Sequence, residues 1–208
     1  MRLFLHRVRV CKVVLFAAFI LGFSTAEASP QSPDLFFGGD SKVTVTYYLI
    51  EGRSISELRE AIRKNGPKDS NGVSRYASTD WYIRWNIKPT KDSAVNPDLL
   101  TVDYQANVLL PLVTNIDALS PEDTKYWNSF FHALLVHERG HIDICRTRYR
   151  EVADAIKLAV KQNPRCSPEE AEKVAQRQVA LIHADDLIYD QDTKHGMTQG
   201  VTLIRKSE

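Results

Sequence analysis

The stretch SPEDTKYWNSFFHALLVHERGH, residues 120–141, decides what kind of fold this chain can adopt. Ser120 followed by Pro121 is typical of a helix start, because serine caps free backbone N–H groups and proline fits the first helical turn. Large apolar side chains then recur at helical spacing, at Trp127, Phe130, Phe131 and Leu134. This pattern predicts a helix with one buried, apolar face.

The same helix carries an HExxH motif, His137-Glu138-Arg139-Gly140-His141. Residues four apart share one face of a helix, so the two imidazoles can reach a single Zn²⁺. The apolar stripe, continued from Leu134, lands on the two histidines and on the glutamate, which predicts that all three face inward. An inward set of this kind needs partners that burial alone does not provide. We therefore expect a zinc site rather than a pair of structural histidines.

The glutamate of the motif completes the groups needed for hydrolysis. Two histidines and a third ligand leave one coordination position for water, whose pKa zinc lowers from about 15.7 to about 7. Glu138 would accept the proton of this water as it attacks a carbonyl, and would then pass the proton to the leaving group.

The overall charge excludes some classes of partner. The 208 residues include 27 Lys and Arg against 26 Asp and Glu, a net charge of +1. A balance of this kind predicts neither a nucleic-acid partner nor binding to an anionic membrane surface.

The first 28 residues have the pattern of a secretory signal peptide. Basic residues precede an apolar run at positions 13–23, which is short for a membrane span, and Ala26-Glu27-Ala28 supplies the small side chains that signal peptidase accepts. We expect cleavage after Ala28, no stable membrane anchoring, and a secreted or periplasmic single domain over residues 29–208. An uncleaved anchor is the alternative.

Three stretches of alternating apolar residues predict β-strands. They are Val43, Val45 and Tyr47; Trp81, Ile83, Trp85 and Ile87; and Leu100, Val102, Tyr104, Ala106 and Val108. A capping box at Ser54 and Glu57, with a stop at residues 65–67, predicts a short helix after the first strand. The expected fold class is α+β, with a small, mostly antiparallel sheet before the helices.

Two long helices should follow the sheet. The first would carry HExxH and continue, with or without a bend, to Asn163-Pro164. The second would begin at Ser167 and run toward Tyr189. The short connection predicts antiparallel packing, so the chain after Ile188 should return beside His141. The residues expected to face inward are Val174, Leu181, Ile182, Ile188 and Tyr189.

The returning segment, residues 189–196, contains three candidates for the third zinc ligand: Asp190, Asp192 and His195. We predict His195, because Gly196 lets the backbone turn tightly and an imidazole keeps the site all-nitrogen. Asp190 is the alternative ligand, or a partner that orients the ligands.

Other polar residues near the expected site have possible roles. Tyr189 and Lys194 are candidates for stabilising the developing oxyanion. Asp185 lies on the predicted inward stripe, where it would either orient a ligand histidine or form a buried salt bridge. His132 and His183 point elsewhere around their helices and are expected to be ordinary.

The predicted mature chain has two cysteines, Cys145 and Cys166. If one helix ran from Cys145 to Asn163, their Cα atoms would lie roughly 30 Å apart, against a limit near 7 Å for a disulfide. We expect free or differently paired thiols unless that helix breaks early.

Several motifs together are specific for a known family. They are Tyr48 to Gly52, Leu58 with Gly66-Pro67, Thr79-x-Trp81 with Trp85, Leu110-Pro111, Trp127 before HExxH, Tyr189-Asp190-x-x-Thr193-x-His195-Gly196, and Gln199-Gly200. With these, the chain resembles a secreted bacterial family called domain of unknown function 922, described as predicted Zn-dependent proteases. The resemblance implies a zincin-like α+β fold and a secreted or periplasmic setting. It implies no substrate.

The sequence thus predicts an exported zinc metallopeptidase with a peptide or protein substrate, which would lie extended against an edge strand. Two alternatives stay open. The protein could be an exported interaction module with structural zinc, in which Glu138 is dispensable, or it could hydrolyse a non-peptide amide such as a cell-wall cross-link.

Overall fold

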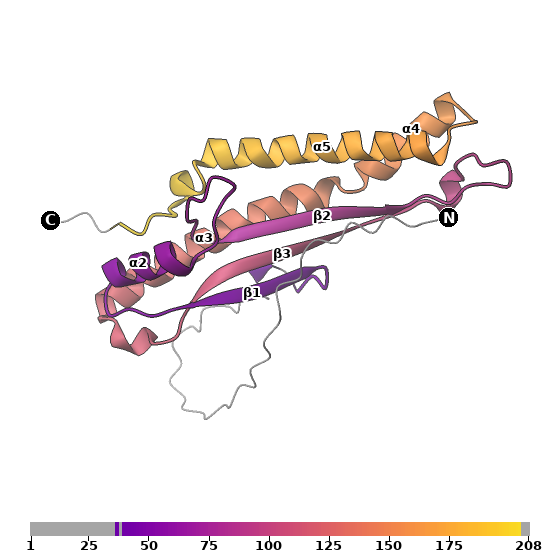
Figure 1. The fold of residues 1–208 in the computed structure, drawn as a ribbon. Coiled ribbons are helices and arrows are strands. Elements are labelled where there is room, and N and C mark those ends of the chain that lie inside the picture. Colours follow the sequence, from indigo (N-terminus) through magenta and orange to yellow (C-terminus); the bar gives the residue numbers. More distant parts are fainter. Residues whose placement is uncertain (1–35, 38, 205–208) are drawn as a thin grey trace.

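The computed structural model describes residues 36–37 and 39–204 (Figure 1). The expected signal peptide and its cleavage site lie outside these residues. Within the described part of the chain, no helix combines the length and the apolar character that crossing a bilayer requires.

The fold is α+β, as expected, with a three-stranded sheet in the order β1-β3-β2. The strands are β1 (Val43–Ile50), β2 (Ser78–Asn86) and β3 (Thr101–Val113). β3 pairs antiparallel with β2 but parallel with β1, so the sheet is mixed and not mostly antiparallel. The reason is the connection through α2 (Ile55–Asn65), after which β2 takes the far edge and β3 returns between the two.

One face of the sheet forms part of the core. Trp81 and Ile83 of β2 are buried, as are Tyr104, Ala106 and Val108 on the predicted face of β3. In β1 the predicted alternation holds at Val43 and Val45 but fails at Tyr47, which is exposed while Tyr48 is half-buried. The Tyr48 hydroxyl donates a hydrogen bond to the carbonyl of Tyr76 at 2.6 Å, which holds that side chain inward.

Three helices complete the fold: α3 (Pro121–Arg148), α4 (Glu151–Gln162) and α5 (Pro168–Thr193). Ser120 and Ser167 cap α3 and α5 through their side chains, as predicted. The chain leaves the first helix at Tyr149 and starts a new one at Glu151, so the segment expected to form one helix is two. α5 runs back antiparallel to α3 (Figure 1), which returns its end to the middle of α3.

The buried stripe of α5 differs from the predicted one. Ile182 is fully buried, as predicted, but Leu181 and Ile188 are half exposed, and Ala171 and Ala175 are fully buried instead. Small alanines let α5 approach its neighbours closely, and the buried face therefore follows them rather than the largest side chains.

Both cysteines of the described chain are free and buried. Although the helix after Cys145 breaks early, no disulfide joins Cys145 to Cys166. Burial raises the pKa of the Cys145 thiol to about 12, which keeps it protonated and inert.

Candidate metal centre

The HExxH residues lie on the inner face of α3. His137, Glu138 and His141 are 4%, 4% and 6% exposed, so the predicted inward orientation is confirmed. Successive turns of the helix place the two imidazoles next to each other, with ring centroids 4.9 Å apart.

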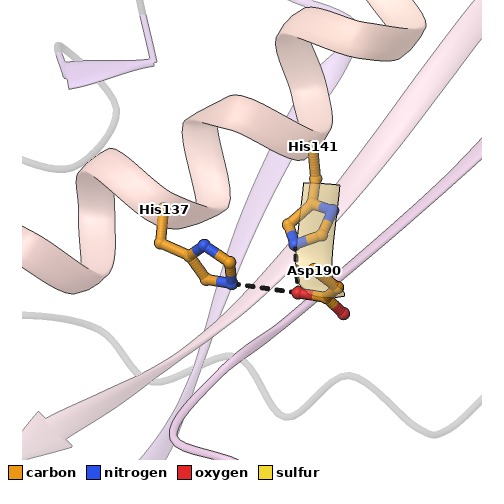
Figure 2. A group of neighbouring side chains, drawn as sticks. All are labelled: His137, His141 and Asp190. Carbon is orange, nitrogen blue, oxygen red and sulfur yellow. Dashed lines mark ion pairs between the residues drawn. The ribbon is translucent and has the colours of Figure 1, made fainter. Parts of the chain in front are cut away.

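A carboxylate from α5 faces both rings. Oδ1 of Asp190 lies 3.3 Å from Nε2 of His137 and 3.3 Å from Nε2 of His141 (Figure 2). One ligand atom from each of the three residues lies within 4.8 Å of the other two. Two imidazole nitrogens and a carboxylate oxygen that converge on one point can hold a metal ion.

His195, the predicted third ligand, is not in this group. Its side chain is 48% exposed, and its Nδ1 lies 3.1 Å from Oδ2 of Asp190, on the far side of that carboxylate. α5 continues to Thr193, so Asp190 still projects from the helix toward α3, while Lys194 and His195 adopt left-handed φ angles just after the helix ends. Asp192 is exposed. The structure thus brings together the alternative named above, Asp190.

Each histidine is also held at its second ring nitrogen. Nδ1 of His141 lies 2.8 Å from Oδ1 of Asp186, and Nδ1 of His137 lies 3.0 Å from Oε1 of Gln199. Because a carboxylate only accepts hydrogen bonds, Asp186 keeps a proton on Nδ1 of His141, and Nε2 is the nitrogen left to bind a metal once its own proton is lost. The Nε2 atoms are the ones that face Asp190.

Of the two roles expected for Asp185, the structure shows a salt bridge, although a half-exposed one, and the carboxylate that orients a histidine is the next residue. Asp185 is half exposed and forms an ion pair with Arg148, whereas Asp186 contacts His141. Side chains at successive positions of a helix point about 100° apart. Asp185 therefore lies off the face of α5 that meets α3, whereas Asp186 lies on it. Gln199 was missed as a site residue, although it lies in the Gln199-Gly200 motif.

Glu138 is buried beside the two imidazoles, where a strand holds it. The hydroxyl of Thr79 in β2 donates a hydrogen bond to Oε2 of Glu138 at 2.7 Å. Burial raises the pKa of Glu138 above its usual value, while the bond from Thr79 and the nearby histidines act in the opposite direction. Among the described residues, no hydrogen bond is found to the second oxygen of this carboxylate, which can therefore accept a proton.

The electrostatics of the cluster favour a cation. Burial alone would raise the pKa of Asp190, but the two imidazoles outweigh it and hold that pKa far below the usual range. Burial lowers the pKa of His141, yet Asp186 and Asp190 raise it to about 10. Acidic groups at Glu138, Asp186 and Asp190 thus surround two rings that a metal needs in their neutral form.

Tyr189 lies against both rings but points into α3. Its ring stacks on His137 at 5.3 Å and 17°, and meets His141 edge-on at 5.0 Å and 88°. Its hydroxyl donates to the backbone carbonyl of His137 at 3.1 Å. Lys194 is exposed at the end of α5, and no described contact brings it to the cluster.

The other histidines of the helices have ordinary partners. His183 stacks on Trp81 with ring centroids 4.1 Å apart, and His132 meets Phe36 edge-on at 5.7 Å. The group of possible metal ligands among the described residues includes neither.

The chain belongs to the family described as bacterial protein of unknown function (DUF922), whose model matches residues 45–196. The match covers the chain from β1 to the turn after α5, and so includes the three residues of the cluster. No significant match was found among curated proteins or among solved structures.

Proposed function

We propose that this protein is an exported zinc-dependent hydrolase, most simply a metallopeptidase. His137, His141 and Asp190 would hold Zn²⁺, and Glu138 would act as the general base. When bound, the metal would supply a Lewis acid and a coordinated water of lowered pKa.

One observation carries this proposal. Nε2 of each histidine and Oδ1 of Asp190 converge, while the other polar atom of each side chain has its own partner in Asp186, Gln199 or His195. Side chains oriented in this way are typical of metal ligands, because outer hydrogen bonds fix the ring and carboxylate directions before the ion binds.

The position of Glu138 favours hydrolysis over the other chemistry of this donor set. Two histidines and one carboxylate also hold iron in oxygen-activating enzymes. A buried carboxylate beside the ligands, steadied by Thr79 and with one oxygen available, instead suits the deprotonation of water.

A purely structural zinc is less well supported. Structural zinc sites normally have four protein ligands, whereas the cluster found among the described residues has three. The fourth position would stay open for water and substrate.

A peptide substrate fits the neighbouring strand. β2 is an edge of the sheet and carries Thr79, whose hydroxyl reaches the general base. An extended peptide paired with an edge strand would therefore run past the cluster with its carbonyls in regular positions. Amides in a cell-wall cross-link remain the alternative substrate.

The test compares zinc content and hydrolysis in Glu138→Gln. Mature protein should bind about one zinc per chain, and the variant should keep it while hydrolysis of a fluorogenic peptide library or of isolated peptidoglycan falls by about 100- to 10,000-fold. Glu169→Gln is the matched control, since Glu169 is 81% exposed on α5. Equal hydrolysis by Glu138→Gln and the parent would remove the enzyme hypothesis.

A further inference from the structure

We propose that Tyr189 and Gln199 are positioning residues that set the tautomer of His137 through a relay starting at a backbone carbonyl of α3. The inference rests on the proposed function, because it concerns the nitrogen that His137 presents to the metal. It assigns Tyr189 a role different from oxyanion stabilisation.

The relay is a closed loop of three contacts. The hydroxyl of Tyr189 donates to the carbonyl oxygen of His137 at 3.1 Å. Nε2 of Gln199 donates to that hydroxyl at 3.1 Å. Oε1 of the same amide lies 3.0 Å from Nδ1 of His137. The loop thus leaves α3 at the backbone of His137 and returns to the ring of the same residue.

The carbonyl fixes the direction of every proton in the loop. A carbonyl oxygen can only accept a hydrogen bond, so in this contact the Tyr189 hydroxyl is the donor and uses its single proton. The hydroxyl oxygen then accepts from the amide N–H₂ of Gln199, which turns the amide oxygen toward the His137 ring. An oxygen acceptor at Nδ1 requires a proton on that nitrogen, so Nε2, which faces Asp190, is the nitrogen left to bind a metal.

The reversed amide is the competing arrangement. With the amide as it stands, Oε1 of Gln199 also lies 3.3 Å from the Tyr189 hydroxyl, and donation to it would leave the carbonyl of His137 without the tyrosine proton. A reversed amide would set its N–H₂ group against Nδ1 of His137. The relay direction above satisfies all three contacts at once.

Two glycines make room for the relay. A Cβ atom on Gly140, inside the HExxH motif, would collide with the Tyr189 hydroxyl. At Gly196, with φ of 79°, a Cβ atom would lie 2.9 Å from Cγ of His137 and 2.6 Å from Cγ2 of Val201. The ring of His137 is therefore enclosed by Tyr189 on one face and by the backbone of the turn.

The turn that carries Gln199 is held by buried apolar residues. Lys194 and His195 have φ angles of 50° and 52°, a conformation that costs energy for residues other than glycine. Val201 and Leu203, just beyond the turn, are 2% and 0% exposed. Their burial holds the turn against α3 and keeps the Gln199 amide at the ring.

A neutral amide at His137 complements the carboxylate at His141. Asp186 already contributes a negative charge near the cluster, together with Glu138 and Asp190. Gln199 orients the imidazole of His137 without adding a fourth negative charge. The two histidines thus reach the same tautomer by different means.

The experiment uses Tyr189→Phe, which keeps the stacked ring but removes the hydroxyl, and Gln199→Leu, which removes the acceptor. Gln199→Glu is the conservative variant, because a carboxylate still accepts from Nδ1. Tyr126→Phe is the matched control: its hydroxyl also donates to backbone carbonyls, those of Thr202 and Ile204, away from the rings.

Zinc affinity is measured by competition with a chelator, and the ring nitrogens are observed by ¹⁵N NMR of histidine-labelled protein, metal-free and zinc-loaded. Tyr189→Phe and Gln199→Leu should weaken zinc binding about 10- to 100-fold. In the metal-free protein, both should remove the hydrogen-bonded Nδ1–H signal of His137 that the parent protein shows. Gln199→Glu should restore the parent signals, and Tyr126→Phe should change neither measurement.

Unchanged zinc affinity and ring signals in Tyr189→Phe and Gln199→Leu would overturn the relay. So would an equal loss in Tyr126→Phe, which would show that anchoring of the last segment is what matters. A parent protein that binds no zinc would refute the proposed function, while the metal-free ring spectrum would still test the tautomer.

Discussion

Oδ1 of Asp186 lies 2.8 Å from Nδ1 of His141, on the opposite side of the ring from the Nε2 atom that faces Asp190. Asp186→Asn should weaken zinc binding about 10- to 100-fold, because the ring loses a charged acceptor. Chelator competition measures this effect. Asp185→Asn is the control, since the neighbouring carboxylate pairs with Arg148 instead; an equal loss in both variants would contradict a specific role for Asp186.

Replacing each of the two candidates for the third ligand by alanine should show which one binds the metal. Asp190→Ala should abolish stoichiometric zinc binding, because Oδ1 of Asp190 faces both Nε2 atoms. His195→Ala should retain the metal with a smaller loss of affinity, since His195 contacts only the outer oxygen of that carboxylate. Zinc analysis after dialysis provides the measurement, with the exposed Asp192→Ala as control. The reverse result would return the assignment to His195.

Gly140→Ala should destabilise the protein although alanine favours helices. A methyl group there collides with the Tyr189 hydroxyl, and overpacking of this kind typically costs about 1–3 kcal/mol. Thermal unfolding of the zinc-free protein measures the change. In a Tyr189→Ala background the same substitution should cost nothing further; an equal cost in both backgrounds would show that the tyrosine is not the obstacle.

Thr79→Val should lower hydrolysis without changing zinc content. The substitution keeps the shape of the side chain but removes the donor to Oε2 of Glu138, and loss of such a hydrogen bond typically costs about 1–3 kcal/mol, or about 5- to 150-fold in rate. Thr79→Ser should keep most of the activity. Loss of zinc from Thr79→Val would mean that this hydroxyl supports the ligands rather than the base.

The mature protein should begin at Ser29. Ala26 and Ala28 supply the small side chains that signal peptidase accepts, after a short apolar run. Mass spectrometry of protein recovered from the expressing cells and from the medium gives the N-terminus. Membrane-bound protein that still begins at Met1 would indicate an anchored form.

The parts of the site that depend on local periodicity could be predicted from the sequence. His137, Glu138 and His141 face inward because they continue the stripe of one helix, and the serine caps fixed where α3 and α5 begin. The return of α5 toward the motif followed from the short connection between the helices.

The parts of the site and the fold that depend on tertiary packing could not be predicted from the sequence. The alternation of apolar residues predicted the strand β1 but not its parallel pairing with β3, because the pattern within one strand does not indicate which strand lies beside it. The choice of Asp190 over His195 depended on where α5 ends, and that end is set by a turn whose φ angles are sustained by the burial of Val201 and Leu203. Predicting Asp186 as a site residue would have required the rotation of α5 about its axis. Predicting Gln199 would have required the conformation of the same turn.

The distribution of the ligands over two antiparallel helices has a mechanical consequence. With His137 and His141 on α3 and Asp190 on α5, a bound ion is also a cross-link between segments that lie 53 residues apart, counting from 137 to 190. Separating the helices would require the ion to leave. Metal at about 100 times its dissociation constant would raise the free energy of unfolding by about 2.7 kcal/mol. An ion that served the proposed chemistry would therefore also hold the two helices together.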